Sequence, residues 1–141
     1  QIVKRRERSP LRTTSDLVAA VLSAQPRATR GRRSALHPAT RTFLALRMAV
    51  NADLESLATS LQDAIACVAP GGRIAVISFH SGEDRVVKHQ FAAWRRAGVA
   101  ESLTRKPMTP TQTEIAANPR SRSAKLRAVE RAHNPDLPRS A

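Results

Sequence analysis

The sequence predicts an α/β fold with one short buried strand of a parallel sheet near its middle. Pro-Gly-Gly at residues 70–72 is typical of a turn, and the apolar run at residues 74–77 is typical of a strand buried on both faces. The polar residues that follow lead into a helix, for which Ser81 and Asp84 have the spacing of a capping box. Because parallel sheets bind ligands beyond the carboxyl ends of their strands, we expect the functional site at residues 78–84.

Two helices are predicted near the amino-terminal end of the sequence. Residues 2–8 read as the last part of a helix that Ser9-Pro10 stops, since basic side chains suit a helix carboxyl end. Thr13 or Thr14 caps the next helix, whose apolar residues follow helical spacing until Gln25-Pro26. Residues 27–34 hold four arginines without apolar periodicity, and we expect an exposed loop that contacts phosphates.

A long apolar stripe is predicted between residues 37 and 68. Pro38 suits the first turn of a helix, and from Phe43 to Val68 apolar residues recur three or four positions apart. Asn51 is a candidate cap for a second helix that would bend the rod. The continuity of the stripe predicts that both halves pack on one surface.

The part of the chain after the strand predicts one clear helix and one strand. Residues 83–97 place Val86, Val87, Phe91 and Trp94 on one side, with Gly98 as the carboxyl cap. Residues 99–117 are rich in Thr and Pro and read as a sheet edge or a long loop. Apolar and charged residues alternate weakly at residues 125–131, which suits a last strand near a sheet edge. Residues 132–141 read as a tail.

Composition indicates a cytoplasmic protein of one domain. The 141 residues suffice for a core, which must be aliphatic because there are three Phe, one Trp and no Tyr. A single cysteine, Cys67, excludes an internal disulfide and fits a reducing compartment. No apolar run approaches the roughly 20 residues of a membrane span.

Positive charge is concentrated at the two ends of the sequence. Net charge is +9 in residues 1–47, zero in residues 48–117 and +4 in residues 118–141. A neutral core between basic ends favours a nucleic-acid partner. The alternative is a solvated basic surface without a function.

Several kinds of site find no support in the sequence. Ser78, His80 and Asp84 offer hydrolase-like groups, but no Gly-x-Ser-x-Gly motif surrounds them. The spacing of the histidines and the cysteine does not suit zinc. Nucleotide-like cofactors need a glycine-rich turn after a strand, whereas Gly71-Gly72 precedes one. We therefore expect no metal site and no cofactor-binding residue in this chain.

Three separate blocks of sequence resemble the MraW (RsmH) family of S-adenosylmethionine-dependent methyltransferases, which modify the N4 atom of a cytosine in small-subunit ribosomal RNA. The strand-end block is Ser-Phe-His-Ser-Gly-Glu-Asp-Arg-Val-Val-Lys at residues 78–88, where the family usually has Leu in place of Gly82. Residues 37–47 and 118–127 carry the second and third blocks in matching order and spacing, and residues 13–17 a weaker fourth.

The resemblance implies the carboxyl-terminal half of a Rossmann-like (class I) methyltransferase sheet, with the end of a helical inserted domain before it. Residues 1–36 would belong to the inserted domain and its basic loop, and residues 37–131 to the methyltransferase domain. The S-adenosylmethionine site would then lie in a part of the enzyme upstream of this sequence. The implied partner is the ribosomal RNA of the small subunit. The alternative function is a basic RNA-binding or ribosome-associated module without catalysis.

The resemblance also implies site residues at the matching positions. His80 is expected either to act as a base or to organise the loop by hydrogen bonding, and Phe79 either to pack on the cytosine or to join the core. Arg41 and Arg47 either line the substrate cleft or form a solvated helix face, and Arg120 and Arg122 either contact phosphate or pair with Glu83 or Asp84. The expected catalytic residues are His80, Ser78 and Ser81, and the expected substrate- or RNA-binding residues are His37, Arg41, Arg47, Phe79, Asn118, Arg120, Arg122 and Lys125.

Overall fold

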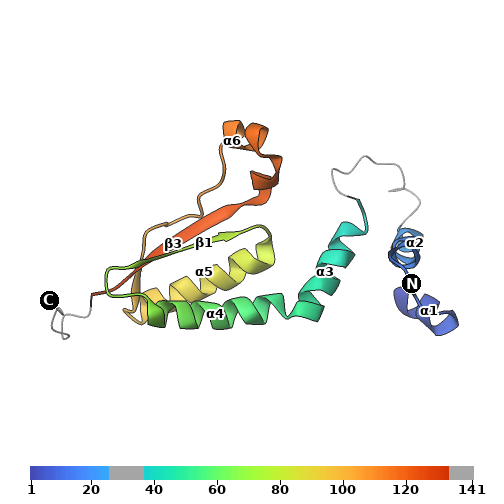
Figure 1. Cartoon of the computed structure of the whole chain (residues 1–141), viewed down its shortest axis with the longest axis horizontal. Helices are drawn as coiled ribbons and strands as arrows, with labels where there is room; N and C mark the ends of the chain where they lie inside the picture. Colours follow the sequence, from blue (N-terminus) through green and yellow to red (C-terminus); the bar gives the residue numbers. More distant parts are fainter. Residues whose placement is uncertain (26–36, 134–141) are drawn as a thin grey trace. The chain divides into compact units, whose positions relative to one another are not determined.

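The computed structural model describes residues 1–25 and 37–133, which fall into two compact units, Gln1–Asp53 and Leu54–Ala141. The expected domain boundary at residue 36, the arginine-rich loop at residues 27–34 and most of the expected tail lie outside the described residues. In chain order the helices are α1 (Ile2–Arg8), α2 (Thr14–Ala24), α3 (Thr40–Asn51), α4 (Asp53–Cys67), α5 (Ser81–Arg96) and α6 (Gln112–Ala117), with a 3₁₀ helix at Pro119–Ser123 (Figure 1).

The first two helices begin and end close to where the sequence predicts. Thr13 caps α2: its hydroxyl accepts the Asp16 N–H at 3.1 Å, and the Asp16 carboxylate accepts the Thr13 N–H at 3.0 Å. The hydrogen bond from the Thr13 side chain is the largest cause of a lowered pKa for Asp16. Ser9 caps α1, as expected.

The apolar stripe from Phe43 to Val68 is divided rather than continuous. Ala52 adopts a left-handed conformation, with φ of 49°, and ends α3 before α4 begins. In α4, Leu61 and Ile65 are buried in the core, whereas Val50 of α3 is 82% exposed. Because α3 belongs to the first unit and α4, from Leu54 on, to the second, the packing of both halves on one surface stays a prediction.

The sheet is antiparallel in the described residues, which corrects the prediction of a parallel sheet. Its strands are β1 (Arg73–Ser78), β2 (Ala100–Ser102) and β3 (Lys125–Arg131), in the order β1-β3-β2. Both β1 and β2 pair antiparallel with β3. The mixed α/β class is confirmed. β3, expected near a sheet edge, is the central strand of the three described and lies between β1 and β2.

The core lies between the sheet and the two helices α4 and α5, which share one face of it (Figure 1). Val87, Phe91 and Trp94 of α5 are buried as predicted, and the Phe91 and Trp94 rings stack with centroids 5.4 Å apart. Ile74 and Val129 meet them from β1 and β3. Gly98, with φ of 68°, follows the end of α5 and confirms the predicted glycine cap.

The other face of the sheet is apolar and exposed in the described residues. The prediction that β1 is buried on both faces is wrong here, because its side chains alternate and Ile77 is 55% exposed. Phe79, which follows β1, is 55% exposed, and Met108, which bridges to Leu126 of β3, is 62% exposed. Within the described residues, β1 is also an edge strand.

A tight turn joins α4 to β1 and is fixed by Arg131. The Gly71 N–H donates to the Arg131 carbonyl and the Arg131 N–H to the Gly72 carbonyl, each at 2.8 Å. The Arg131 guanidinium donates to the carbonyls of Ala66, at 3.3 Å, and Val68 at the end of α4. This side chain therefore satisfies carbonyls that a helix end leaves without partners.

Candidate functional site

His80 and Glu83 form the cap that joins β1 to α5. His80 is the residue before the helix, and its Nδ1 accepts the Glu83 N–H at 3.3 Å. The Glu83 carboxylate in turn accepts the N–H groups of Phe79 at 2.9 Å and His80 at 3.4 Å. The prediction that Ser81 and Asp84 form the capping box is therefore wrong by one residue. The pair His80 and Glu83 has the same spacing of three residues. The His80 ring accepts the N–H of Glu83 in the first turn, and the Glu83 carboxylate accepts N–H groups just before the helix.

The remaining ring nitrogen of His80 is enclosed in the protein. Because Nδ1 accepts a hydrogen bond, the neutral ring carries its proton on Nε2. Nε2 lies 3.0 Å from Glu83 Oε1 but is not aligned for a hydrogen bond, and it is buried without another acceptor in the described residues. This geometry favours the interpretation of His80 as a residue that organises the strand tip.

The other predicted residues of the strand tip differ in exposure. Ser78 is buried, and its hydroxyl donates to the Lys125 carbonyl at 3.4 Å across the β1–β3 pair. Ser81 is exposed at the first position of α5. Phe79 is exposed and does not belong to the core of the described residues. Its ring is thus available for stacking on an external group.

Asp84 and Arg127 form the strongest ionic contact of the tip. Arg127 Nε lies 2.7 Å from Asp84 Oδ1, and Arg127 Nη2 lies 3.3 Å from Oδ2, so the pair is bidentate. Their side chains are only 12% and 13% exposed. The hydrogen bond from Arg127 is the largest cause of a lowered pKa for Asp84. Lys125 joins the pair, with Nζ 3.5 Å from Oδ2.

Sequence reasoning missed Arg127, although one signal was present. Arg127 lies two residues after Lys125 on β3, so both side chains point to the face that α5 covers. A cation on a buried face needs an acidic partner, and Asp84 is one turn into the helix on that face.

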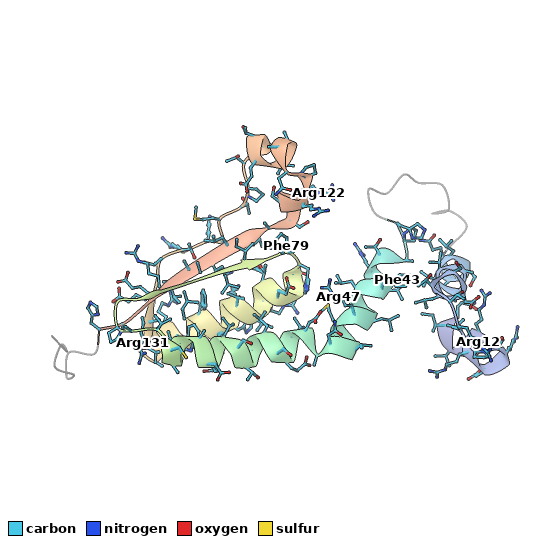
Figure 2. The ribbon with its side chains drawn as sticks, viewed as in Figure 1. Arg12, Phe43, Arg47, Phe79, Arg122 and Arg131 are labelled. Carbon is cyan, nitrogen blue, oxygen red and sulfur yellow. The ribbon has the colours of Figure 1, made fainter. Side chains whose placement is uncertain are left out.

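The turn at residues 118–123 presents two arginines at the same end of the sheet. Asn118 caps the 3₁₀ helix, with its Oδ1 accepting the Arg120 N–H at 3.3 Å and its carbonyl accepting the Ser121 hydroxyl at 2.8 Å. Because Ser78 pairs with Lys125, this turn leads directly to the strand tip (Figure 2). Arg120 and Arg122 are exposed and form no ion pair in the described residues, so their expected pairing with Glu83 or Asp84 is wrong.

A second group of predicted residues lies in the first unit, at the start of α3. His37 Nδ1 accepts the Ala39 N–H at 3.2 Å and shapes the entry to the helix. His37, Phe43 and Arg47 line one side of an open hollow of about 460 Å³. Arg47 also pairs with Asp53, with Nε 3.3 Å from Oδ2. Arg41 is exposed and does not line the hollow.

The glycine pair before β1 does not offer free N–H groups to a nucleotide-like cofactor. The N–H groups of Gly71 and Gly72 already donate, both at 2.8 Å, to the carbonyls of Arg131 and Ala69. In the same ranges, no cluster of three or more His, Cys, Asp or Glu side chains is arranged to bind a metal ion. No helix there has the length and apolarity that crossing a membrane requires.

Residues 1–132 match the MraW methylase family. The chain belongs to this family. It is 53% identical over 125 residues to the ribosomal RNA small subunit methyltransferase H of Synechococcus elongatus, which covers 89% of this chain and 40% of that protein. The corresponding protein of Rhodopirellula baltica is 51% identical over 129 residues, covering 92% of this chain and 38% of its own length. That of Geobacter sp. strain M21 is 48% identical over 145 residues, with 92% and 46% covered.

The family match covers residues 1–132 of this chain. The chain itself spans only 38–46% of the length of these three relatives. All three sequence blocks that carry the resemblance lie within the matched residues. The predicted family is confirmed.

Proposed function

We propose that this chain forms the carboxyl-terminal part of an enzyme that methylates the N4 atom of a cytosine in small-subunit ribosomal RNA. The family match over residues 1–132 carries this proposal. S-adenosylmethionine would supply the methyl group. Its binding site would lie in the part of the relatives that this chain does not cover. The bacterial relatives support a cytoplasmic location.

Two features of the sheet support a larger methyltransferase domain. Within the described residues β1 has one unpaired edge, and Ile77 and Phe79 leave one face apolar and exposed. An unpaired strand edge and an uncovered apolar face are costly in water. A Rossmann-like sheet would continue from this edge and carry helices on this face.

The residues of this chain would position RNA rather than hold the methyl donor. His80 and Glu83 fix the strand tip, which leaves the Phe79 ring exposed for packing on a base. Arg120 and Arg122 lie in the turn beside it without internal partners in the described residues. Cations placed in this way bind phosphates and set the orientation of the RNA. His37, Arg41 and Arg47 would add contacts from the first unit.

The second candidate function is a basic RNA-binding or ribosome-associated module without catalysis. The net charge of +13 favours it, because such a charge attracts RNA whether or not chemistry follows. The two proposals differ in whether methyl transfer accompanies binding.

Joining the chain to the missing part of the fold tests the proposal. The segment of the Synechococcus elongatus protein that precedes its match to this chain would be fused to residue 1, or co-expressed with the chain. We expect transfer of labelled methyl groups from S-adenosylmethionine to small ribosomal subunits by the joined protein. Neither part alone should be active, and by calorimetry this chain alone should not bind S-adenosylmethionine.

Two results would contradict the proposal. A joined protein that is folded, binds S-adenosylmethionine and binds small subunits but transfers no methyl group would favour the module without catalysis. Stoichiometric binding of S-adenosylmethionine to this chain alone with a micromolar Kd would require about 8 kcal/mol from a site that the described residues do not contain.

A further inference from the structure

A second basic site shares Arg127 with the strand tip and lies along α5, between that helix and the chain around the end of β2. It is a hollow of about 140 Å³, which we call the α5 hollow. Lys88, Phe91 and Arg95 line it from α5, where their spacing of three and four places them on one helix face. Ser102 at the end of β2, Thr104 and Arg105 line it as a second wall, and Arg127 of β3 also lines it.

Hydrogen bonds to β3 hold the wall at residues 102–105 in place. The N–H groups of Leu103 and Thr104 donate to the Ala128 carbonyl at 3.0 and 3.3 Å. The Thr104 hydroxyl accepts the Ala128 N–H at 3.0 Å, and the Ser102 hydroxyl donates to the Thr104 carbonyl at 3.0 Å. The wall is thus built against the central strand, and Arg105 follows directly from it.

The α5 hollow carries positive charge that the described protein does not neutralise. Four cations line it, from α5, β3 and residue 105, and no carboxylate does. Arg127 is paired with Asp84. Lys88, Arg95 and Arg105 are exposed and form no ion pair with another described residue. Three like charges around one small hollow repel one another, so an anion bound among them relieves that repulsion.

We propose that the α5 hollow binds a phosphate group of the RNA backbone. The hollow, of about 140 Å³ and open to solvent, has room for one phosphate group. Arg127 would contribute the N–H donors that Asp84 leaves unused. A polyanion is favoured over free phosphate because it brings further phosphates to the exposed side chains around the rim. This inference rests on the proposed function in taking ribosomal RNA as the polyanion.

The test compares two triple variants of the 141-residue chain. The first removes the unpaired charges of the hollow: Lys88→Gln, Arg95→Gln and Arg105→Gln. The control is Arg85→Gln, Arg96→Gln and Lys106→Gln. It removes the same charges from the same two segments, at exposed positions that do not line the hollow. Binding of a fluorescent single-stranded RNA is measured by anisotropy over a series of salt concentrations.

We expect the hollow variant to bind RNA roughly three- to tenfold more weakly at low salt than the control variant. The slope of log affinity against log salt should be shallower for the hollow variant than for the control variant by at least about 0.7, which is the value for one phosphate contact on a single strand. In the unmodified chain, RNA should shift the NMR amide signals of residues 102–105, which tests the site even where a variant folds poorly. Inorganic phosphate at constant ionic strength should displace RNA only at millimolar concentrations.

Equal slopes for the two triple variants, or unshifted amide signals at residues 102–105, would overturn the proposal. Saturation of those signals by micromolar inorganic phosphate with an unchanged RNA slope would also overturn it, in favour of a free-phosphate site. None of these readouts needs S-adenosylmethionine or methyl transfer. Failure of this inference is therefore distinguishable from failure of the proposed function.

Discussion

Replacing Asp84 with Asn should destabilise the second unit measurably at neutral pH. Asp84 accepts two hydrogen bonds from Arg127, at 2.7 and 3.3 Å, and a longer one from Lys125. An Asn side chain keeps one acceptor but removes the negative charge. Arg127, with a side chain only 12% exposed, would then remain a cation beside Lys125 without a counter-charge.

The expected cost lies between two limits. Breaking a fully buried ion pair costs roughly 3–5 kcal/mol, and losing an exposed pair about 0–1 kcal/mol. The Asp84–Arg127 pair is nearly buried, but Lys125 is 39% exposed and Asn retains an acceptor. We therefore expect the free energy of unfolding to fall by about 2 kcal/mol at pH 7. Asp84→Leu with Arg127→Met should cost less than either single change, because no nearly buried charge is left unpaired and Lys125, at 39% exposed, keeps its contact with water.

The pH dependence of this cost follows from the lowered pKa of Asp84. The pKa of Asp84 is lower in the folded protein than in the unfolded chain, where an Asp has a pKa of about 3.9. The carboxylate therefore stabilises the fold at pH values above that unfolded pKa, and this contribution is lost as the pH falls through the folded pKa. The difference in free energy of unfolding between the original chain and Asp84→Asn should be largest at pH 6–7 and should shrink in strong acid. Asp16 has a lowered pKa too, but it is present in both proteins and cancels.

Urea unfolding at several pH values measures this difference. Asp63→Asn is the matched control, because Asp63 is exposed on α4 and has no partner among the described residues; its effect should stay below about 0.5 kcal/mol. A difference for Asp84→Asn that is the same at pH 7 and in strong acid would refute the role assigned to its charge. So would a cost no larger than that of the control.

Substitutions at four further positions test the local geometry by melting temperature or urea midpoint. Gly72→Ala should cost about 1–3 kcal/mol because its Cβ would lie 2.8 Å from the Ala69 carbonyl oxygen. Gly98→Ala, strained at φ of 68° but in open space, should cost about 1 kcal/mol; equal costs would argue against the close approach at Gly72. Arg131→Ala should cost about 1–2 kcal/mol through the uncapped carbonyls of α4, and an unchanged midpoint would contradict that role. His80→Ala should cost about 1 kcal/mol and His80→Asn much less, because Asn is a good amino-terminal cap; a loss of activity per folded molecule in the joined enzyme that Asn does not rescue would instead support a catalytic role.

Local features of the fold could be predicted from the sequence because they depend on nearby residues. The turn at residues 70–72, the strand that follows and the apolar face of α5 all appear where periodicity and turn chemistry place them. The capping box was placed one residue late because two overlapping pairs share its spacing. Only the position of the backbone at the end of β1 selects the pair of His80 and Glu83.

The features that could not be predicted depend on distant contacts. One missed feature is local: Thr111 caps α6 by accepting the Glu114 N–H at 3.1 Å, a spacing present in the segment read as a sheet edge or loop. The order β1-β3-β2 pairs β3 with β1, about 50 residues before it, and with β2, about 30 residues before it, which no local pattern reveals. The contact between Asp84 and Arg127 follows from that pairing, so it was hidden as well.

The charge profile along the sequence also hides an arrangement that the structure reveals. Residues 48–117 have no net charge, but their charges are separated between elements. α4 carries three carboxylates and no Lys or Arg, whereas α5 and the segment after β2 carry six cations. Of the two acids on α5, Asp84 is paired with Arg127 and Lys125, and the Glu83 carboxylate caps the helix. The segment that looked like a neutral core therefore presents a cationic surface along α5, and RNA would be attracted to that surface rather than to α4.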